Sequence, residues 1–216
     1  MIDPASITQL DILHHDDDLL IVNKPSGLLS VPGKGPENQY CLHKLALQFN
    51  PNARVVHRLD QATSGIVMFP LNYPTLKAMT AQFEAREIHK RYEAIVSGVL
   101  NDDEGEVKLP LICDWPNRPK QMVCFEQGKA AHTRYKVISR NLAEDTTRVE
   151  LEPVSGRTHQ LRVHMLSLGH PILGDRLYAP EAIIAKAPRL YLHAKQIWLP
   201  HPITGADIEI NCPTPF

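Results

Sequence analysis

The arrangement of apolar and polar residues along the chain predicts several short strands. Apolar runs rich in β-branched residues, each ended by polar or turn-forming residues, are typical of strands. The strands predicted at residues 10–14 and 19–24 flank an Asp-rich turn, and we expect them to form a hairpin. The strands predicted at residues 132–139 and 147–152 are also expected to pair. The strands predicted in this way cover residues 10–14, 19–24, 54–56, 66–69, 89–97, 132–139 and 147–152.

Three further segments have the helical spacing of apolar residues, which recur at positions i, i+3, i+4 and i+7. Proline and glycine residues lie near their ends, where helices usually stop. The predicted helices are residues 42–49, residues 75–86, and a segment capped by Thr158 that runs to about residue 168. With the strands, they predict an α+β fold without internal repeats.

Length and composition exclude several classes of protein. A chain of 216 residues can bury a substantial core without a cofactor. It has no apolar run long enough for a membrane helix, and residues 1–4 do not begin a signal peptide of the usual kind. We therefore expect a soluble, cytoplasmic protein.

The sequence also predicts no metal site and no nucleotide cofactor. The four cysteines form no CxxC pair, and His159 and His164 are spaced five apart, outside the i, i+4 spacing of two helical zinc ligands. The loop at residues 24–35 contains glycines but lacks the spacing of a phosphate-binding loop.

The net charge of −1 hides an uneven distribution. Five acids and no lysine or arginine lie in residues 1–18, so the remainder carries a net charge of +4. Between residues 115 and 140 the single acid Glu126 is outnumbered by six basic residues: Arg118, Lys120, Lys129, Arg134, Lys136 and Arg140. Such a local excess attracts phosphate groups. The alternative is a solvated face whose charges happen to share a sign.

The most informative polar segment is residues 57–65, which lies between two predicted strands. It places the carboxylate of Asp60 close to His57 and Arg58 in a loop near a strand end, where catalytic groups are often held. The alternative is that Asp60 only forms hydrogen bonds within its own turn.

Two other residues are candidates for a site. Tyr92 lies in the strand predicted at residues 89–97 and shares a face with Ala94 and Val96, so it is either a core tyrosine or a ring offered to a flat ligand. Arg162 lies beside the apolar stripe of the third helix. It is either exposed or buried, and if buried it needs a carboxylate in a bidentate pair.

Three segments of the chain combine such candidate residues in a distinctive order. They are His57-Arg58-Leu59-Asp60 with Thr63-Ser64-Gly65, Lys90-Arg91-Tyr92-Glu93-Ala94, and Gly156-Arg157-Thr158-His159-Gln160-Leu161-Arg162. Together they resemble the signature motifs of the RluA-type pseudouridine synthases, and a fourth segment, residues 170–175 with Tyr178, fits the same family. Each motif alone would be weak, but their order and spacing are specific, and they place nearly the whole chain from about Leu10 onward.

This resemblance implies a fold and a set of partners. The expected fold is the family's catalytic domain, a mixed and largely antiparallel sheet flanked by helices and loops around a central cleft. We expect residues 1–216 to form this single domain, without the S4-like N-terminal domain of larger relatives. Residues 109–121 resemble a dual-specificity branch that modifies 23S rRNA and the tRNA anticodon loop. RNA stem-loops are then the partners, with no cofactor, membrane or obligate protein partner.

The resemblance also implies roles for single residues. Asp60 corresponds to the catalytic carboxylate and Tyr92 to the tyrosine that stacks on the uracil. Because a guanidinium favours the ionised form of a carboxylate, we also predict that Arg162 is in direct contact with Asp60. Arg58 corresponds to the residue that occupies the space left by a base turned out of its stack. The expected RNA-binding residues are His57, Arg58, Arg118, Lys120, Lys129 and Arg134.

Two other classes of protein remain as alternatives. One is an RNA-binding module with the same fold but no activity. The other is a glycosidase-like hydrolase that combines Asp60 with a second acid such as Asp175.

Overall fold

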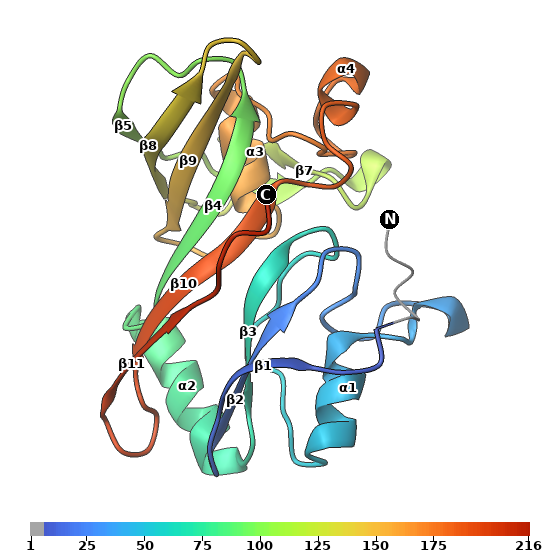
Figure 1. Ribbon diagram of the computed structural model, residues 1–216, viewed down its shortest axis with the longest axis vertical. Helices are drawn as coiled ribbons and strands as arrows, with labels where there is room; N and C mark the ends of the chain where they lie inside the picture. The colour runs from blue at the N-terminus through green and yellow to red at the C-terminus, as the bar shows by residue number, and fades with distance from the viewer. Residues whose placement is uncertain (1–6) are drawn as a thin grey trace. The chain divides into compact units, whose positions relative to one another are not determined.

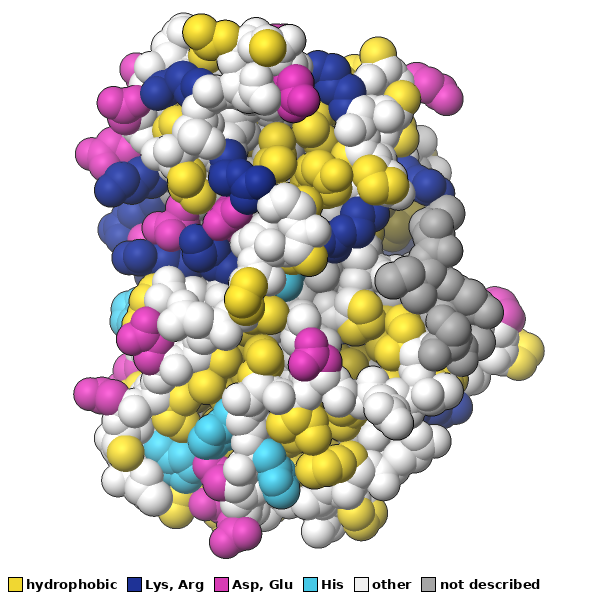
Figure 2. Space-filling model, in the orientation of Figure 1, with side chains coloured by type: hydrophobic (Ala, Val, Ile, Leu, Met, Phe, Trp, Pro, Cys, Tyr) yellow, Lys and Arg dark blue, Asp and Glu magenta, His cyan; other side chains and the backbone are white. Residues whose placement is uncertain are grey.

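The computed structural model describes residues 7–216, so the N-terminal stretch at residues 1–4 discussed above lies outside it. The chain forms two compact units: unit 1 contains Met1–Lys90 and Ala194–Pro215, and unit 2 contains Arg91–His193 and Phe216. Both are shown in Figure 1. On the face drawn in Figure 2, most lysine and arginine side chains lie over the elements of unit 2, which is the unit that contains the basic run at residues 115–140.

Both units combine strands with few helices, which confirms the predicted α+β class. The strands are β1 (Asp11–His15), β2 (Leu19–Lys24), β3 (Ser64–Pro70), β4 (His89–Ser97), β5 (Glu104–Val107), β6 (Leu111–Cys113), β7 (Gln121–Val123), β8 (Thr133–Asn141), β9 (Thr146–Pro153), β10 (Leu192–Pro200) and β11 (Asp207–Asn211). The helices are α1 (Leu42–Phe49), α2 (Tyr73–Ala85), α3 (Gln160–Ser167) and α4 (Glu181–Ile184), with short 3-10 turns η2 (Pro36–Asn38) and η3 (Trp115–Asn117).

Unit 1 contains a sheet in the order β1-β2-β3-β10-β11. Strands β1 and β2 form the predicted antiparallel hairpin, in which Asp11 is opposite Asn23. Strand β2 then pairs antiparallel with β3, and β10 with β11. The helix predicted at residues 42–49 is confirmed as α1, and the one predicted at residues 75–86 as α2, which begins two residues earlier.

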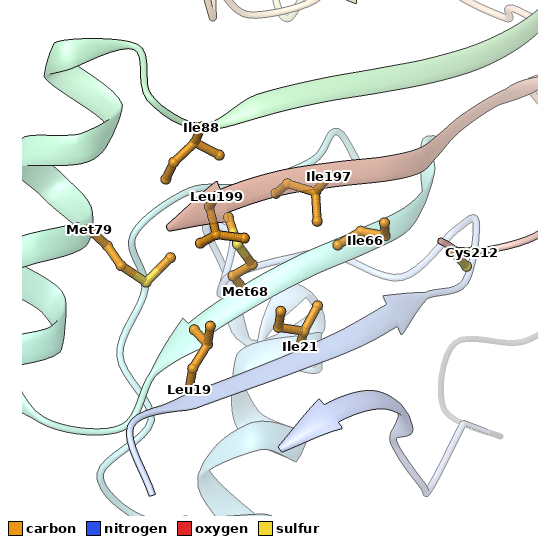
Figure 3. Close-up of a cluster of buried hydrophobic side chains, with 9 residues drawn as sticks. All are labelled: Leu19, Ile21, Ile66, Met68, Met79, Ile88, Ile197, Leu199 and Cys212. Atoms are coloured by element: carbon orange, nitrogen blue, oxygen red, sulfur yellow. The ribbon is translucent and has the colours of Figure 1, made fainter. Parts of the chain in front are cut away.

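Both faces of the unit 1 sheet are covered, which explains why β2 and β3 are continuous apolar runs and do not alternate. One face packs against α2 around Met79, as Figure 3 shows. On the other face, the ring of His43 in α1 stacks on Phe69 at 5.9 Å between centroids. The cluster in Figure 3 contains Leu19, Ile21, Ile66, Met68, Met79, Ile88, Ile197, Leu199 and Cys212.

Unit 2 is built on antiparallel strands in the order β4-β9-β8-β5. The strand predicted at residues 89–97 is confirmed as β4, and the predicted pair at residues 132–139 and 147–152 as β8 and β9. A separate hairpin of β6 and β7 lies beside α3, and Val163 of that helix packs with Leu111 of β6.

Three local predictions need correction. Residues 54–56 are not a strand, although the Arg54 N–H donates to the Pro70 carbonyl at 2.8 Å. Thr158 does not cap α3, because His159 in a left-handed conformation (φ 54°) precedes the helix. The helix is also buried on every side from Gln160 to Met165, so the exposed alternative for Arg162 is wrong.

Every helix within residues 7–216 is too short or too polar to cross a lipid bilayer. The four cysteines are free thiols, of which Cys41 and Cys212 are buried, while Cys113 and Cys124 are partly exposed.

Candidate functional site

Asp60 lies in the loop that precedes β3, in unit 1, where its side chain is half-buried. The loop is attached to residues 24–30 by hydrogen bonds on both sides of Asp60. Before it, the buried hydroxyl of Ser30 donates to the carbonyl of Leu59 at 2.8 Å and accepts the N–H of the same residue at 3.1 Å. After it, the hydroxyl of Ser26 donates to the carbonyl of Ala62 at 2.7 Å. The main chain around Asp60 is therefore held from both directions.

The ammonium of Lys24 strengthens this attachment. Lys24 is fully buried, and its Nζ donates to the carbonyls of Leu28 at 2.8 Å, Pro25 at 3.0 Å and Gln61 at 3.1 Å. The Gln61 carbonyl also accepts the N–H of Gly27 at 2.8 Å. A buried ammonium needs such acceptors because an unpaired buried charge is costly. Lys24 thus joins the end of β2 to the residue after Asp60.

Gly65, the second residue of β3, allows the start of this strand to lie close to the main chain of β10. Its φ is +112°, and a Cβ at this position would lie 2.3 Å from the carbonyl oxygen of Ala194. No larger residue fits there without moving the backbone. This glycine therefore sets how the Asp60 loop enters the sheet.

His57 has a different environment from the one expected of a phosphate-binding residue. Its Nε2 accepts the N–H of Met68 at 2.9 Å, and its ring lies 5.5 Å from that of Phe83. Burial, together with the nearby ammonium of Lys90, lowers the pKa of His57 to about 3. The imidazole is therefore neutral at pH 7. A role for His57 in RNA binding stays a prediction, and such a role cannot depend on positive charge.

In unit 2, Arg162 of α3 is buried (4% exposed) and paired with Asp175, which is 1% exposed. Arg162 Nε lies 2.8 Å from Asp175 Oδ2, and Nη2 lies 2.6 Å from Oδ1. This is the bidentate guanidinium–carboxylate geometry expected of a buried arginine. Asp175 Oδ1 also accepts the backbone N–H groups of Leu177 at 3.0 Å and Tyr178 at 3.3 Å. The pair thus fastens α3 to the turn that follows it.

Tyr178 connects this pair to its surroundings. The guanidinium of Arg162 lies 5.0 Å from the centre of the Tyr178 ring, within the range of a cation–π contact. The hydroxyl of Tyr178 accepts the N–H of Gln121 at 2.7 Å and lies 2.7 Å from Nδ1 of His159. The residue before α3 and the first residue of β7 therefore meet at one phenol oxygen.

Tyr92 lies in β4 of unit 2, opposite Leu151 of β9, and its side chain is 8% exposed. It shares the buried side of the strand with Ala94 and Val96, as its position in the alternation predicted. Its backbone position fits either alternative, a core tyrosine or a ring that meets a ligand.

The predicted RNA-binding cations differ in their environment. Arg58 is exposed in the Asp60 loop. The guanidinium carbon of Arg118 lies 3.6 Å from the centre of the Trp115 ring, and Arg134 lies 3.6 Å from a glutamate of β9. Lys120 and Lys129 form no ion pair with any residue from 7 to 216. The local positive charge is thus partly balanced at Arg134.

Within residues 7–216, one group of side chains has ligand atoms close enough to hold a cation: Asp16, Asp18 and His201. Asp16 Oδ2 lies 2.7 Å from Nε2 of His14 and 3.2 Å from Nε2 of His201, and Asp18 Oδ1 accepts the side-chain amide of Asn72 at 2.7 Å. Nδ1 of His201 accepts backbone N–H groups of the turn that follows it. These hydrogen bonds account for the group as a network that joins two turns.

The expected site residues thus fall into two sets. Asp60, Arg58 and His57 belong to unit 1, while Tyr92 and Arg162 belong to unit 2. The direct contact expected between Asp60 and Arg162 stays a prediction, as do the catalytic roles of all three expected catalytic residues. Within unit 2, Arg162 pairs with the carboxylate of Asp175.

Asp175 was not predicted to pair with Arg162, although the sequence held a signal. An arginine beside an apolar stripe needs an acid if it is buried, and Asp175 lies within the fourth segment that fitted the family pattern. Its contacts also argue against the hydrolase alternative, because a carboxylate that is 1% exposed and already accepts hydrogen bonds from a guanidinium and two backbone N–H groups is poorly placed to meet a substrate.

Residues 18–167 match the RNA pseudouridylate synthase family. The chain belongs to this family and is an RNA pseudouridine synthase, an isomerase that modifies RNA. It is 51% identical to the dual-specificity RNA pseudouridine synthase RluA of Yersinia pestis over 95% of this chain and 99% of the relative. It is 49% identical to the RluA protein of Escherichia coli strain K12 over 99% of this chain and 97% of the relative.

A solved structure agrees with this assignment. Human RNA pseudouridylate synthase domain containing 1 superposes with a TM-score of 0.83 at 28% sequence identity, covering 100% of this chain and 87% of the human chain. The predicted fold class and family are therefore confirmed.

The low pKa of His57 predicts a specific acid sensitivity. Below pH 6.5 the unfolded chain protonates this histidine, while the folded protein does so only near pH 3, so the free energy of unfolding falls as the pH drops through this window. A His57→Gln variant, whose amide oxygen can accept the Met68 N–H, lacks this dependence. We expect the wild type to lose about 2 kcal/mol more than the variant between pH 6.5 and 4.5.

Urea unfolding at several pH values measures this difference. His89→Gln, at an exposed position of β4, is the control and should follow the wild type. Parallel curves for the wild type and His57→Gln would show that the imidazole is protonated in the folded protein.

Breaking the Arg162–Asp175 pair should strongly destabilise the fold. Asp175→Asn removes the carboxylate from this buried bidentate pair, for which we expect a loss of about 3 kcal/mol or more in the free energy of unfolding. Glu152→Gln is a matched control, because it removes the acid of the exposed pair with Arg134 and should cost less than about 1 kcal/mol. Equal losses in urea denaturation would contradict the importance given to the buried pair.

Proposed function

We propose that this synthase converts uridine to pseudouridine in stem-loops of 23S rRNA and of the tRNA anticodon arm, with Asp60 as the catalytic carboxylate. The similarity to dual-specificity relatives over nearly the whole chain supports the two classes of substrate. The observation that carries the assignment of Asp60 is its loop, whose main chain is held on both sides while the side chain stays half-buried. The RNAs proposed as substrates are cytoplasmic, so we propose that the protein acts in the cytoplasm.

The reaction needs one bond to break and another to form. The bond between uracil N1 and ribose C1′ is cleaved, the base turns while it stays bound, C5 joins C1′, and the C5 proton leaves. The ionised carboxylate of Asp60 can attack C1′ or remove the C2′ proton to give a glycal. Both routes require a negatively charged oxygen close to the sugar, and neither needs a redox step or a phosphate donor.

Arg162 has a supporting role in this proposal. A guanidinium carries five N–H groups, and the pair with Asp175 uses those on Nε and Nη2. The proposed contact with Asp60 would use others and favour the ionised carboxylate. Asp175, which fixes the plane of the guanidinium, would then be a positioning residue.

The target uridine must leave its stack, which costs a few kcal/mol in an RNA loop. We propose that the exposed Arg58, two residues before Asp60, enters the vacated space or holds the RNA backbone. Lys120 and Lys129 would contact phosphates, which position an RNA without reading its sequence.

The role of Asp60 predicts complete loss of turnover in Asp60→Asn, because the amide carries no negative charge. Purified protein is incubated with 23S rRNA and tRNA transcripts that carry tritium at uridine C5, and the released tritium is mapped by site. We expect release from both RNAs with the wild type and none with the variant. Asp17→Asn, the same change at an exposed aspartate of unit 1, should retain full activity.

Two outcomes would contradict this proposal. Unchanged release by Asp60→Asn would remove Asp60 from the chemistry, and free uracil in place of pseudouridine would indicate a hydrolase. Release from only one of the two RNAs would restrict the protein to a single class of substrate.

The role of Tyr92 is tested by its hydroxyl group. If the ring stacks on the uracil and the hydroxyl assists loss of the C5 proton, Tyr92→Phe should bind the stem-loop with unchanged affinity and lose most of its turnover. Tyr135→Phe removes the hydroxyl of another buried tyrosine in the same sheet and is the matched control. Wild-type turnover by Tyr92→Phe would show that the hydroxyl has no role.

A further inference from the structure

The loop between β6 and β7 is a well-defined structure on the surface of unit 2. The N–H of Asp114 donates to the carbonyl of Lys120 at 3.0 Å and closes the loop at its base. Within it, the side-chain amide of Asn117 donates to Asp114 Oδ2 at 2.9 Å, and the N–H of Asn117 donates to the Asp114 carbonyl at 3.1 Å. These bonds fix the short turn η3, which begins at Trp115.

Trp115 is 63% exposed, which is unusual for a large aromatic side chain. The guanidinium of Arg118 lies against its ring, with 3.6 Å between the guanidinium carbon and the ring centre. An indole and a guanidinium in contact provide two flat, polarisable surfaces with one positive charge. Flat groups of this kind are the ones on which proteins stack unpaired bases.

The loop is also tied to the residues around Arg162. Gln121, directly after the loop, donates its N–H to the hydroxyl of Tyr178 at 2.7 Å. The ring of Tyr178 is the one that contacts the guanidinium of Arg162. Within unit 2, the loop and the proposed catalytic arginine are therefore connected through a single tyrosine.

We infer that Trp115 and Arg118 form a platform on which an unpaired base close to the target uridine stacks. The inference rests on the proposed function and gives these two residues a task apart from phosphate contact. RNA fits this surface better than a protein partner does, because RNA offers both flat bases and negative charge. Lys120 and Lys129, nearby in the sequence, add positive charge and form no ion pairs among residues 7–216. Once the target base is turned out, its neighbours in the loop lose a stacking partner, and the platform would supply one.

The first test compares kinetics on a stem-loop substrate of defined sequence. Loss of one base–aromatic stack corresponds to about a tenfold loss of affinity. We therefore expect Trp115→Ala to raise KM about tenfold and to change kcat less than twofold, while Trp115→Phe restores most of the affinity. Phe125→Ala, which removes an aromatic side chain that is 77% exposed outside this loop, is the matched control and should leave KM within twofold of the wild type.

The second test identifies the base. Nucleotides on either side of the target uridine are replaced one at a time by abasic residues, and KM is measured for the wild type and for Trp115→Ala. If one base stacks on the platform, its removal should raise KM for the wild type and abolish the difference between the two proteins. At the other positions the difference should persist.

Several outcomes would overturn the inference while leaving the proposed function intact. These are an unchanged KM for Trp115→Ala, an equal loss for Phe125→Ala, or a difference that persists for every abasic substrate. An unchanged KM with an altered oligomeric state in gel filtration would assign Trp115 to a protein contact. If the wild type itself forms no pseudouridine on the stem-loop, the proposed function fails first.

Discussion

The buried ion pair between Arg162 and Asp175 is the interaction on which the architecture of unit 2 most depends. Both groups are almost fully removed from water, and each offsets part of the other's loss of hydration. Removing one partner of a buried pair costs about 3 to 5 kcal/mol, a large part of the roughly 5 to 15 kcal/mol by which a domain is stable. The same pair fixes the orientation of the arginine that we propose takes part in the reaction.

Unit 1 holds its candidate catalytic residue in a different way. The hydrogen bonds around Asp60 come from Lys24, Ser26 and Ser30 and end on main-chain atoms of the neighbouring loop residues. Main-chain attachment fixes the position of a loop whatever its side chains do. Such a loop can present a carboxylate at a strand end with little freedom, which is the preorganisation that catalysis requires.

Elements whose burial follows a local pattern of residues could be predicted from the sequence, whereas features that depend on distant contacts could not. Strand β4 and helix α1 were predicted with the bounds that the structure has, because alternation and helical spacing reflect burial of the segment itself. Residues 54–56 have the composition of a strand but lie outside the sheet. Thr158 is a residue type that often caps helices, but it lies one residue before His159, which is the residue at the N-cap of α3. His57 was expected to contact RNA, yet its ring accepts a backbone hydrogen bond from β3.

The sequence alone determined the α+β class, six of the eleven strands and three of the four helices within residues 7–216, the family, and the residues expected to carry the reaction. Motifs and periodic apolar positions are properties of the order of residues, so they can be recognised without coordinates. Only the tertiary structure decided that Arg162 pairs with Asp175, that His57 is neutral, and that Arg118 stacks on Trp115. Partners and charge states depend on which atoms approach in space and on how much water they lose, and neither property follows from the order of residues.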